Sequence, residues 1–252
     1  MNEKYLTDSR FQFKDKVIII TGSTQGIGKE TAKLFASRGA KAITICGRNE
    51  LKGLEVKKDI EKIGSKCIYV KADLANVEDC RKIVSLTEQH FNTVHCLVNV
   101  AGFTERGTII STTLDNYEKN FNINTRAPFL LMQESIKIMR RDKVNGTIAN
   151  ILSMAAYSGM PFLTAYSSSK GALAIMIKNI ANAVVANQIR VNGLNIGWTD
   201  TPGESITQKK FHKAQDDWVE KTEKISKYPG DSPPDPLKNK KSKKIISQIR
   251  KC

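Results

Sequence analysis

The 252-residue sequence lacks several features that would define a function class at once. No apolar run approaches the roughly 20 residues needed to span a bilayer, which argues against membrane insertion. The first ten residues, MNEKYLTDSR, contain no apolar core of a secretory signal. The five cysteines form no C-x-x-C pair, and the three histidines lack the spacing of a zinc site. We therefore expect reduced thiols, a cytoplasmic location and no metal centre.

Acidic residues are scarce relative to basic ones, and the chain carries a net charge of +15. Residues 229–252 hold seven Lys or Arg, two Asp and four of the seven prolines, so we expect a poorly ordered basic tail after a domain at 1–228. Basic stretches are most often solvated. Nucleic-acid binding through this tail is therefore a subordinate hypothesis, and it predicts steep salt dependence.

Short apolar, β-branched runs alternate with longer charged stretches that have a helical pattern. The predicted strands are 16–21, 42–46, 67–70, 96–100, 147–152 and 189–195. The first is followed by a predicted helix over 27–38 that Gly39 ends. This alternation predicts an α/β fold with a doubly wound parallel sheet, covered by helices on both faces. Ligands of such sheets bind beyond the carboxyl ends of the strands.

A glycine-rich loop, Thr21-Gly22-Ser23-Thr24-Gln25-Gly26-Ile27-Gly28, connects the first predicted strand to the first helix. Its backbone N–H groups and the helix N-terminus could bind a pyrophosphate. The spacing G-x-x-x-G-x-G differs from the usual dinucleotide fingerprint, so a loop needed only for packing is the alternative.

The second predicted strand ends at Cys46-Gly47-Arg48. A site for NAD usually has an acidic side chain here, which accepts a hydrogen bond from the ribose 2′-hydroxyl. Gly47 cannot do so, whereas Arg48 could pair with a 2′-phosphate. The pattern favours NADP(H) and leaves NAD(H) possible; the alternative is a solvated surface arginine.

Tyr166 and Lys170 are four residues apart, on one face of a predicted helix. A phenol with a pKa near ~10 is a poor acid or base at neutral pH, and a nearby ammonium would lower that pKa. Ser153 follows a predicted strand, where its hydroxyl could bind a substrate carbonyl or cap a turn.

Over roughly residues 13–205 these segments resemble the short-chain dehydrogenase/reductase family. The matching segments are the loop at Thr21–Gly28, Asp73-Leu74, Asn99-Val100-Ala101-Gly102 (NNAG with Val for the second Asn), Asn124, the triad Ser153, Tyr166 and Lys170, and the loop Gly197-Trp198-Thr199-Asp200-Thr201. The resemblance implies a Rossmann-like three-layer fold and an NADP(H)-dependent oxidoreductase that interconverts an alcohol and a carbonyl.

The resemblance also implies a role for each matching residue. Tyr166 would be the general acid or base, Lys170 would lower its pKa and bind the nicotinamide ribose, Ser153 would orient the carbonyl, and Asn124 would hold a water. The implied cofactor-binding residues are Gly22, Ser23, Thr24, Gln25, Gly26, Ile27, Gly28, Arg48, Asp73, Leu74, Asn99, Ala101, Gly102, Tyr166, Lys170, Gly197, Thr199 and Thr201. Apolar residues that could line a pocket for a small-molecule substrate are Phe103, Met154, Met160, Phe162 and Trp198.

The C-terminus departs from the family pattern. Relatives continue into a further helix and a last strand, whereas residues 229–252 here have neither pattern. We expect the sheet to lack that last strand, and the homo-oligomer typical of the family is in question. The departure leaves an alternative function open: a catalytically silent relative that acts through cofactor or partner binding.

Overall fold

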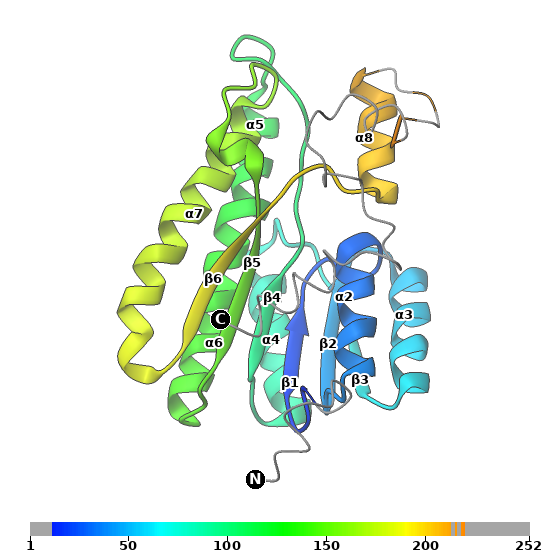
Figure 1. Cartoon of the computed structure of the whole chain (residues 1–252), viewed down its shortest axis with the longest axis vertical. Helices are drawn as coiled ribbons and strands as arrows, with labels where there is room; N and C mark the ends of the chain where they lie inside the picture. Colours follow the sequence, from blue (N-terminus) through cyan, green and yellow to red (C-terminus); the bar gives the residue numbers. More distant parts are fainter. Residues whose placement is uncertain (1–11, 213–214, 216–217, 220–252) are drawn as a thin grey trace, which may run out of the picture.

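The fold is built on a six-stranded parallel sheet. The computed structural model describes residues 12–212, 215, 218 and 219 (Figure 1). The strands are β1 (Val17–Ile20), β2 (Ala42–Gly47), β3 (Lys66–Lys71), β4 (Cys96–Asn99), β5 (Thr147–Ser153) and β6 (Arg190–Ile196). Each lies within one residue of its predicted bounds at either end, so the predicted doubly wound α/β fold is confirmed.

The strand order is β3-β2-β1-β4-β5-β6, so the direction of winding reverses at β1. Ile20 at the end of β1 is in register with Ile45 of β2 on one side and with Val98 of β4 on the other. At such a reversal the connections after neighbouring strands leave in opposite directions, which opens a crevice at the carboxyl ends. The glycine-rich loop begins at this point.

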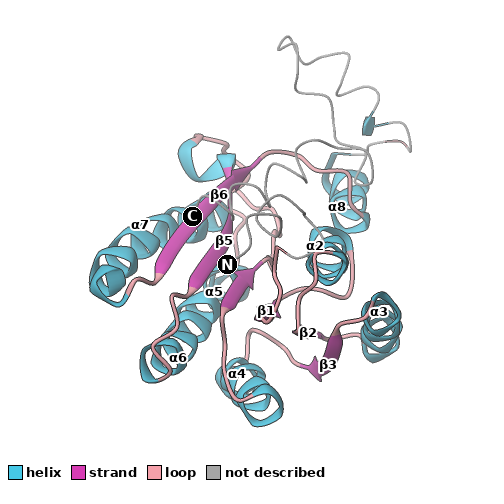
Figure 2. Ribbon diagram, turned by 60° about the horizontal axis from the view of Figure 1, so that its bottom comes forward, coloured by secondary structure: helices cyan, strands magenta, loops and turns pink. Residues whose placement is uncertain are grey.

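Helices cover both faces of the sheet (Figures 1 and 2). The helices are α2 (Gly26–Ser37), α3 (Glu50–Ile63), α4 (Val77–Phe91), α5 (Leu114–Phe121), α6 (Ala127–Arg141), α7 (Thr164–Val184) and α8 (Pro202–His212), with short 3-10 turns at Met154–Tyr157 and Val185–Asn187. Helices α2 and α3 pack on one face, and α4, α6 and α7 pack on the other. Within the described part of the chain, no helix is long and apolar enough to cross a membrane.

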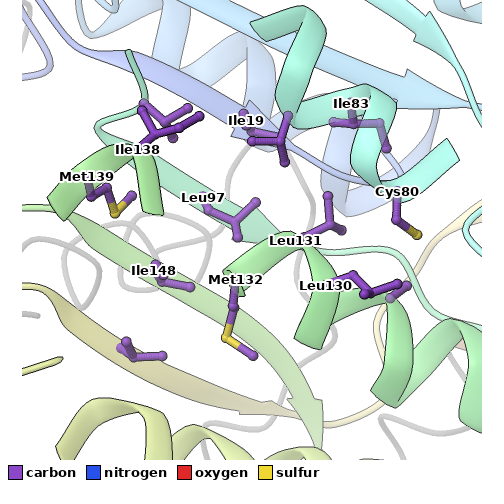
Figure 3. Close-up of a cluster of buried hydrophobic side chains, with 14 of the residues drawn as sticks. Ile19, Cys80, Ile83, Leu97, Leu130, Leu131, Met132, Ile138, Met139 and Ile148 are labelled. Atoms are coloured by element: carbon purple, nitrogen blue, oxygen red, sulfur yellow. The ribbon is translucent and has the colours of Figure 1, made fainter. Parts of the chain in front are cut away.

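Successive residues of β1 enter opposite cores because side chains alternate along a strand. Ile18 and Ile20 pack with Phe35 of α2, whereas Ile19 packs with residues of α4 and α6. Figure 3 shows the second core, where Ile19, Leu97 and Ile148 of three strands meet Ile83 and Leu131. Both faces of the sheet are thus apolar, which explains why its strands read as continuous hydrophobic runs.

A π-helical turn joins α5 to α6. It spans Asn122–Arg126 and is followed directly by α6, which has a proline, Pro128, in its first turn. Pro128 has no N–H, so the carbonyl of Asn124 lacks the donor that residue i+4 supplies in an α-helix. Single π turns of this kind occur mostly at functional sites.

Helix α8 follows β6 and lies beyond the carboxyl end of the sheet (Figure 1). The predicted tail at 229–252, and the question of a last strand, fall outside the described residues.

Two helical glycines give a test of the packing. A Cβ on Gly171 of α7 would meet nothing closer than Ala156 O at 3.9 Å, whereas one on Gly53 of α3 would lie 2.1 Å from Cε2 of Tyr69. Gly171→Ala should stabilise the protein by about 0.5–1 kcal/mol, because alanine is the better helix former. Gly53→Ala should destabilise it by about 1–3 kcal/mol, because the ring must move. Urea unfolding measures both, and equal stabilisation by the two changes would contradict this packing.

Candidate active site

The glycine-rich loop packs so tightly that side chains are excluded from two of its positions. Gly22 has φ +61°, and a Cβ there would lie 2.8 Å from Cα of Ala101 in the loop after β4. A Cβ on Gly28 would lie 2.2 Å from the carbonyl oxygen of Gly22. Helix α2 can therefore begin directly against the end of β1, with its first N–H groups facing the crevice.

Polar side chains fix this loop to its neighbouring strands. Ser23 is fully buried; its hydroxyl donates to the Ile20 carbonyl at 2.7 Å and accepts from Cys46 N at 3.0 Å. The hydroxyl oxygen of Thr21 accepts from the backbone N–H groups of Val100 and Ala101 at 3.0 and 3.2 Å. The ends of β1, β2 and β4 are thereby held at fixed positions around the crevice.

A cavity of about 300 Å³ opens at this crevice. Among the residues predicted to bind the cofactor, those that line it are Gly22, Thr24, Gln25, Gly26, Ile27, Gly28, Arg48, Asp73, Leu74, Ala101, Gly102 and Thr201. They come from the loops after four different strands and from the start of α8, so residues more than 170 positions apart in the chain meet at one site.

Other predicted cofactor residues do not line the cavity. Ser23 is turned inward as described, and Asn99 is buried with its amide donating to Oδ1 of Asn150 at 2.8 Å. Gly197 and Thr199 bond to each other through the Thr199 hydroxyl at 3.3 Å. The side chains of Ser23 and Asn99, both predicted to bind the cofactor, instead form hydrogen bonds within the protein that stabilise the site.

Several residues of the cavity wall are not among the predicted cofactor-binding residues, although one of them, Phe103, is a predicted substrate-pocket residue. These are Cys46, Gly47, Ala72, Val100, Phe103, Ile123 and Gly203. Five of them directly precede or follow a predicted site residue, whereas Cys46 and Gly203 lie two positions from Arg48 and Thr201. A position at the end of a strand could have indicated all but Ile123, which is in the π turn, and Gly203, which is in α8.

Ser153 and Tyr166 lie close together, and Lys170 is one helical turn after Tyr166. None of the three lines the cavity, although Nζ of Lys170 lies 3.7 Å from where a Cβ on Gly102 of the cavity wall would be. Ser153 ends β5, whereas Tyr166 and Lys170 lie on α7. The hydroxyl of Ser153 hydrogen-bonds to the phenol of Tyr166 and also accepts from Ala155 N at 3.1 Å, so it serves as both site group and turn cap. Lys170 is 3% exposed, and its Nζ donates to the Ile151 carbonyl at 2.7 Å.

The electrostatics of the Tyr166 phenol differ from the sequence-based expectation. Burial raises its pKa above the ordinary value of 10.0, the hydrogen bond from Ser153 lowers it, and the charge of Glu204 raises it. Lys170 is not among the groups that shift this pKa, so the lowering expected from it is not found; its ammonium donates to the Ile151 carbonyl. Burial lowers the pKa of Lys170 to about 8.

Both polar atoms of the Asn124 side chain are hydrogen-bonded within the protein. Its Oδ1 accepts from Phe103 N at 2.8 Å, and its Nδ2 donates to Phe103 O at 2.8 Å and to the Ser169 hydroxyl at 3.0 Å. The Ser169 hydroxyl in turn donates to the Tyr166 carbonyl at 2.7 Å. The Asn124 side chain therefore joins the loop after β4 to α7, and its main-chain carbonyl is a further acceptor that a water at this residue could use.

The predicted substrate-pocket residues lie in different environments. Phe103 borders the cavity, and the ring of Phe162 lies under the guanidinium of Arg106. Met154, Met160 and Trp198 are exposed. Their role in binding substrate stays a prediction.

Comparisons with known proteins agree with this geometry. A family model described as short chain dehydrogenase matches residues 16–211. The chain is 36% identical over 191 residues to an uncharacterized oxidoreductase of Thermotoga maritima, covering 76% of this chain and 74% of that protein. It is 33% identical over 187 residues to L-xylulose reductase of Caenorhabditis elegans, covering 74% and 73%.

The structure of L-sorbose reductase from Gluconobacter frateurii, complexed with NADPH and L-sorbose, is similar with a TM-score of 0.85. The two chains are 26% identical, and the match covers 96% of this chain and 91% of that one. The protein belongs to the short-chain dehydrogenase family and is an oxidoreductase of that family.

Proposed function

We propose that the protein reduces the carbonyl group of a small molecule with NADPH, and that Tyr166 is the general acid. The observation that carries the proposal is that Ser153 hydrogen-bonds the phenol of Tyr166, while Lys170 on the same helix has its Nζ 3.7 Å from where a Cβ on Gly102, a residue of the cavity wall, would lie. Two relatives, one of them in complex with NADPH, are named as reductases of the ketoses xylulose and sorbose.

When bound, the cofactor supplies the hydride that the carbonyl carbon accepts. The Ser153 hydroxyl donates a hydrogen bond to the carbonyl oxygen and holds it beside the phenol. Tyr166 then gives its proton to the oxygen, which completes the alcohol. At neutral pH the phenol is protonated because its pKa is above 10.0, so it is in the form that reduction needs.

Lys170 and Asn124 support this proton transfer. The Lys170 ammonium stabilises the phenolate that forms, since a positive charge favours the anionic form. The main-chain carbonyl of Asn124, whose helical donor is missing at Pro128, is available to a water that could return a proton toward Lys170.

The preference for NADPH rests on the end of β2. A Cβ on Gly47 would lie 2.7 Å from Cγ2 of Thr24, so an acidic side chain at this position would collide with the glycine-rich loop. Arg48 lines the cavity next to it, and Nζ of Lys52 lies 3.4 Å from Oε1 of Gln25 in that loop. A 2′-phosphate here would meet positive charge.

Arg48→Ala should weaken NADPH binding about 10–100-fold, because a charge-assisted hydrogen bond contributes about 1.5–3 kcal/mol. NADH has no 2′-phosphate, so its dissociation constant should change less than about threefold. Fluorescence titration with each cofactor measures both constants. Arg81→Ala is the matched control, since Arg81 is an exposed arginine of α4 that pairs with Glu78. Equal weakening of NADPH and NADH would contradict the assignment.

The whole proposal is tested by NADPH oxidation with a panel of ketones and aldehydes that includes L-xylulose and L-sorbose. Turnover of at least one carbonyl is expected. NADPH binding without turnover of any of them would favour the alternative, a catalytically silent relative.

A further inference from the structure

We propose that Arg106 is a specificity-determining residue that binds a carboxylate of the substrate, so that the carbonyl compound is an oxo acid. The proposal rests on the proposed reductase function and specifies its substrate class.

The Arg106 guanidinium is buried, and two of its three nitrogens have no hydrogen-bond partner among the described residues. Its side chain is 8% exposed, and Nε and Nη1 are buried with no hydrogen-bond partner in the described part of the chain. Burial lowers the pKa of Arg106, which reflects the cost of removing the charge from water. Burying a charge is costly unless the charge is both paired and hydrogen-bonded, and Arg106 has the carboxylate of Glu204 near it without a hydrogen bond to it.

The nearest carboxylate does not satisfy this cation. Oε1 of Glu204 lies 3.9 Å from Nη2 of Arg106, which is beyond hydrogen-bond distance, and the same oxygen accepts from Nε2 of Gln208 at 2.7 Å. The other contacts of the guanidinium are with aromatic rings: Cζ lies 5.2 Å from the centroid of Phe162 and 5.9 Å from that of Phe211. The surroundings are apolar, which would strengthen a hydrogen bond to an anionic oxygen.

Arg106 precedes a residue that contacts the start of the helix carrying Tyr166. The next residue, Gly107, bridges to Leu163, and its N–H donates to Phe162 O at 3.0 Å. Leu163 directly precedes α7, which places Tyr166 in the first turn of the same helix. Glu204, on the other side of Arg106, is close enough to Tyr166 to raise the pKa of the phenol. A substrate with its carbonyl at Tyr166 can therefore extend toward Arg106.

The start of α8 would have to adjust to admit the carboxylate. Glu204 lies in the first turn of α8, and Lys210 of the same helix pairs with Glu105 at 3.0 Å. Glu204 competes with an incoming carboxylate for Arg106, so its charge should oppose binding of the acid. Removing the charge of Arg106 should therefore weaken binding of the acid, and removing the charge of Glu204 should strengthen it.

The test uses oxo acids in which two to five carbon atoms separate the carbonyl from the carboxylate, each paired with its amide. For at least one length the wild type should have a kcat/KM for the acid about tenfold or more above that for the amide. Arg106→Gln should lower this acid-to-amide ratio about tenfold or more, and Arg106→Lys should lower it less. Glu204→Gln should raise the ratio. Lys210→Gln, which removes a cation from the same contact between loop and helix, should leave the ratio within about twofold.

If Arg106→Gln lowers kcat/KM for the acid and for the amide by the same factor, the proposal is overturned. Arg106 would then be a purely structural support of α8. A wild-type ratio of one or less, with the amides reduced, would also overturn it while leaving the reductase function intact. If no carbonyl is turned over, the carboxylate site is tested instead by measuring how the same acids and amides bind to the NADPH-saturated protein. Acid binding that Arg106→Gln abolishes upholds the carboxylate site although the reductase function has failed, and no preference for the acids overturns it.

Discussion

Tyr166→Phe should lower kcat for carbonyl reduction by about 10³-fold, and the dissociation constant for NADPH should change less than about threefold. The variant keeps the ring and its packing but loses the only proton that Tyr166 can give, and general acid catalysis contributes about 10²–10⁴-fold. Steady-state NADPH oxidation and a fluorescence titration measure the two quantities on the same sample.

The matched control is Tyr157→Phe, which removes a phenol hydroxyl from an exposed tyrosine in the 3-10 turn after β5. It should retain wild-type turnover within about twofold. A Tyr166→Phe variant that turns over normally would exclude the proposed general acid, whatever the substrate.

The second large effect is expected at Lys170, which follows Tyr166 by one helical turn on α7. Burial lowers its pKa to about 8, so in the free enzyme the ammonium is present below this pH and is lost above it. The reductive kcat/KM of the wild type should therefore be flat below about pH 7 and decline as the pH rises through about 8. Lys170→Met should lower kcat/KM about 10²–10³-fold at pH 7 and should lack this decline.

Lys170→Arg separates charge from structure, because a guanidinium stays protonated across the range. It should recover part of the activity and move the decline to higher pH. Lys178→Met is the control, since Lys178 is an exposed lysine two turns further along the same helix. A wild-type profile that stays flat to pH 10 would show that the charge of Lys170 does not matter for reduction.

The sheet could be predicted closely because its strands are buried on both faces. A run such as Val17–Ile20 has no polar residue to interrupt it, and the glycines after it mark its end. The placement of Ser153, Tyr166 and Lys170 around one point follows from the same pattern, since a strand end and the first turn of the next helix are neighbours in a parallel sheet.

Side-chain direction within the loops could not be predicted in the same way. Ser23 and Gln25 lie in the same glycine-rich loop, yet Ser23 points between two strands and Gln25 lines the cavity, and this depends on contacts with Cys46 and Ile20 far along the chain. The pKa of Tyr166 is raised rather than lowered as predicted, for a related reason. The sequence shows that Lys170 is near, but it does not show that Ile151 accepts its hydrogen bond.

The π turn at Asn122–Arg126 has a consequence for how this gene can vary in length. Removing one codon there would let the segment close into ordinary α-helix, which turns everything before it by about 100° relative to α6. Asn120 and Asn116, now buried one and two turns before Asn124, would rotate away from the interior. Loops elsewhere can gain or lose residues at small cost. The continuous helical segment of α5, the π turn and α6 should not tolerate such a deletion.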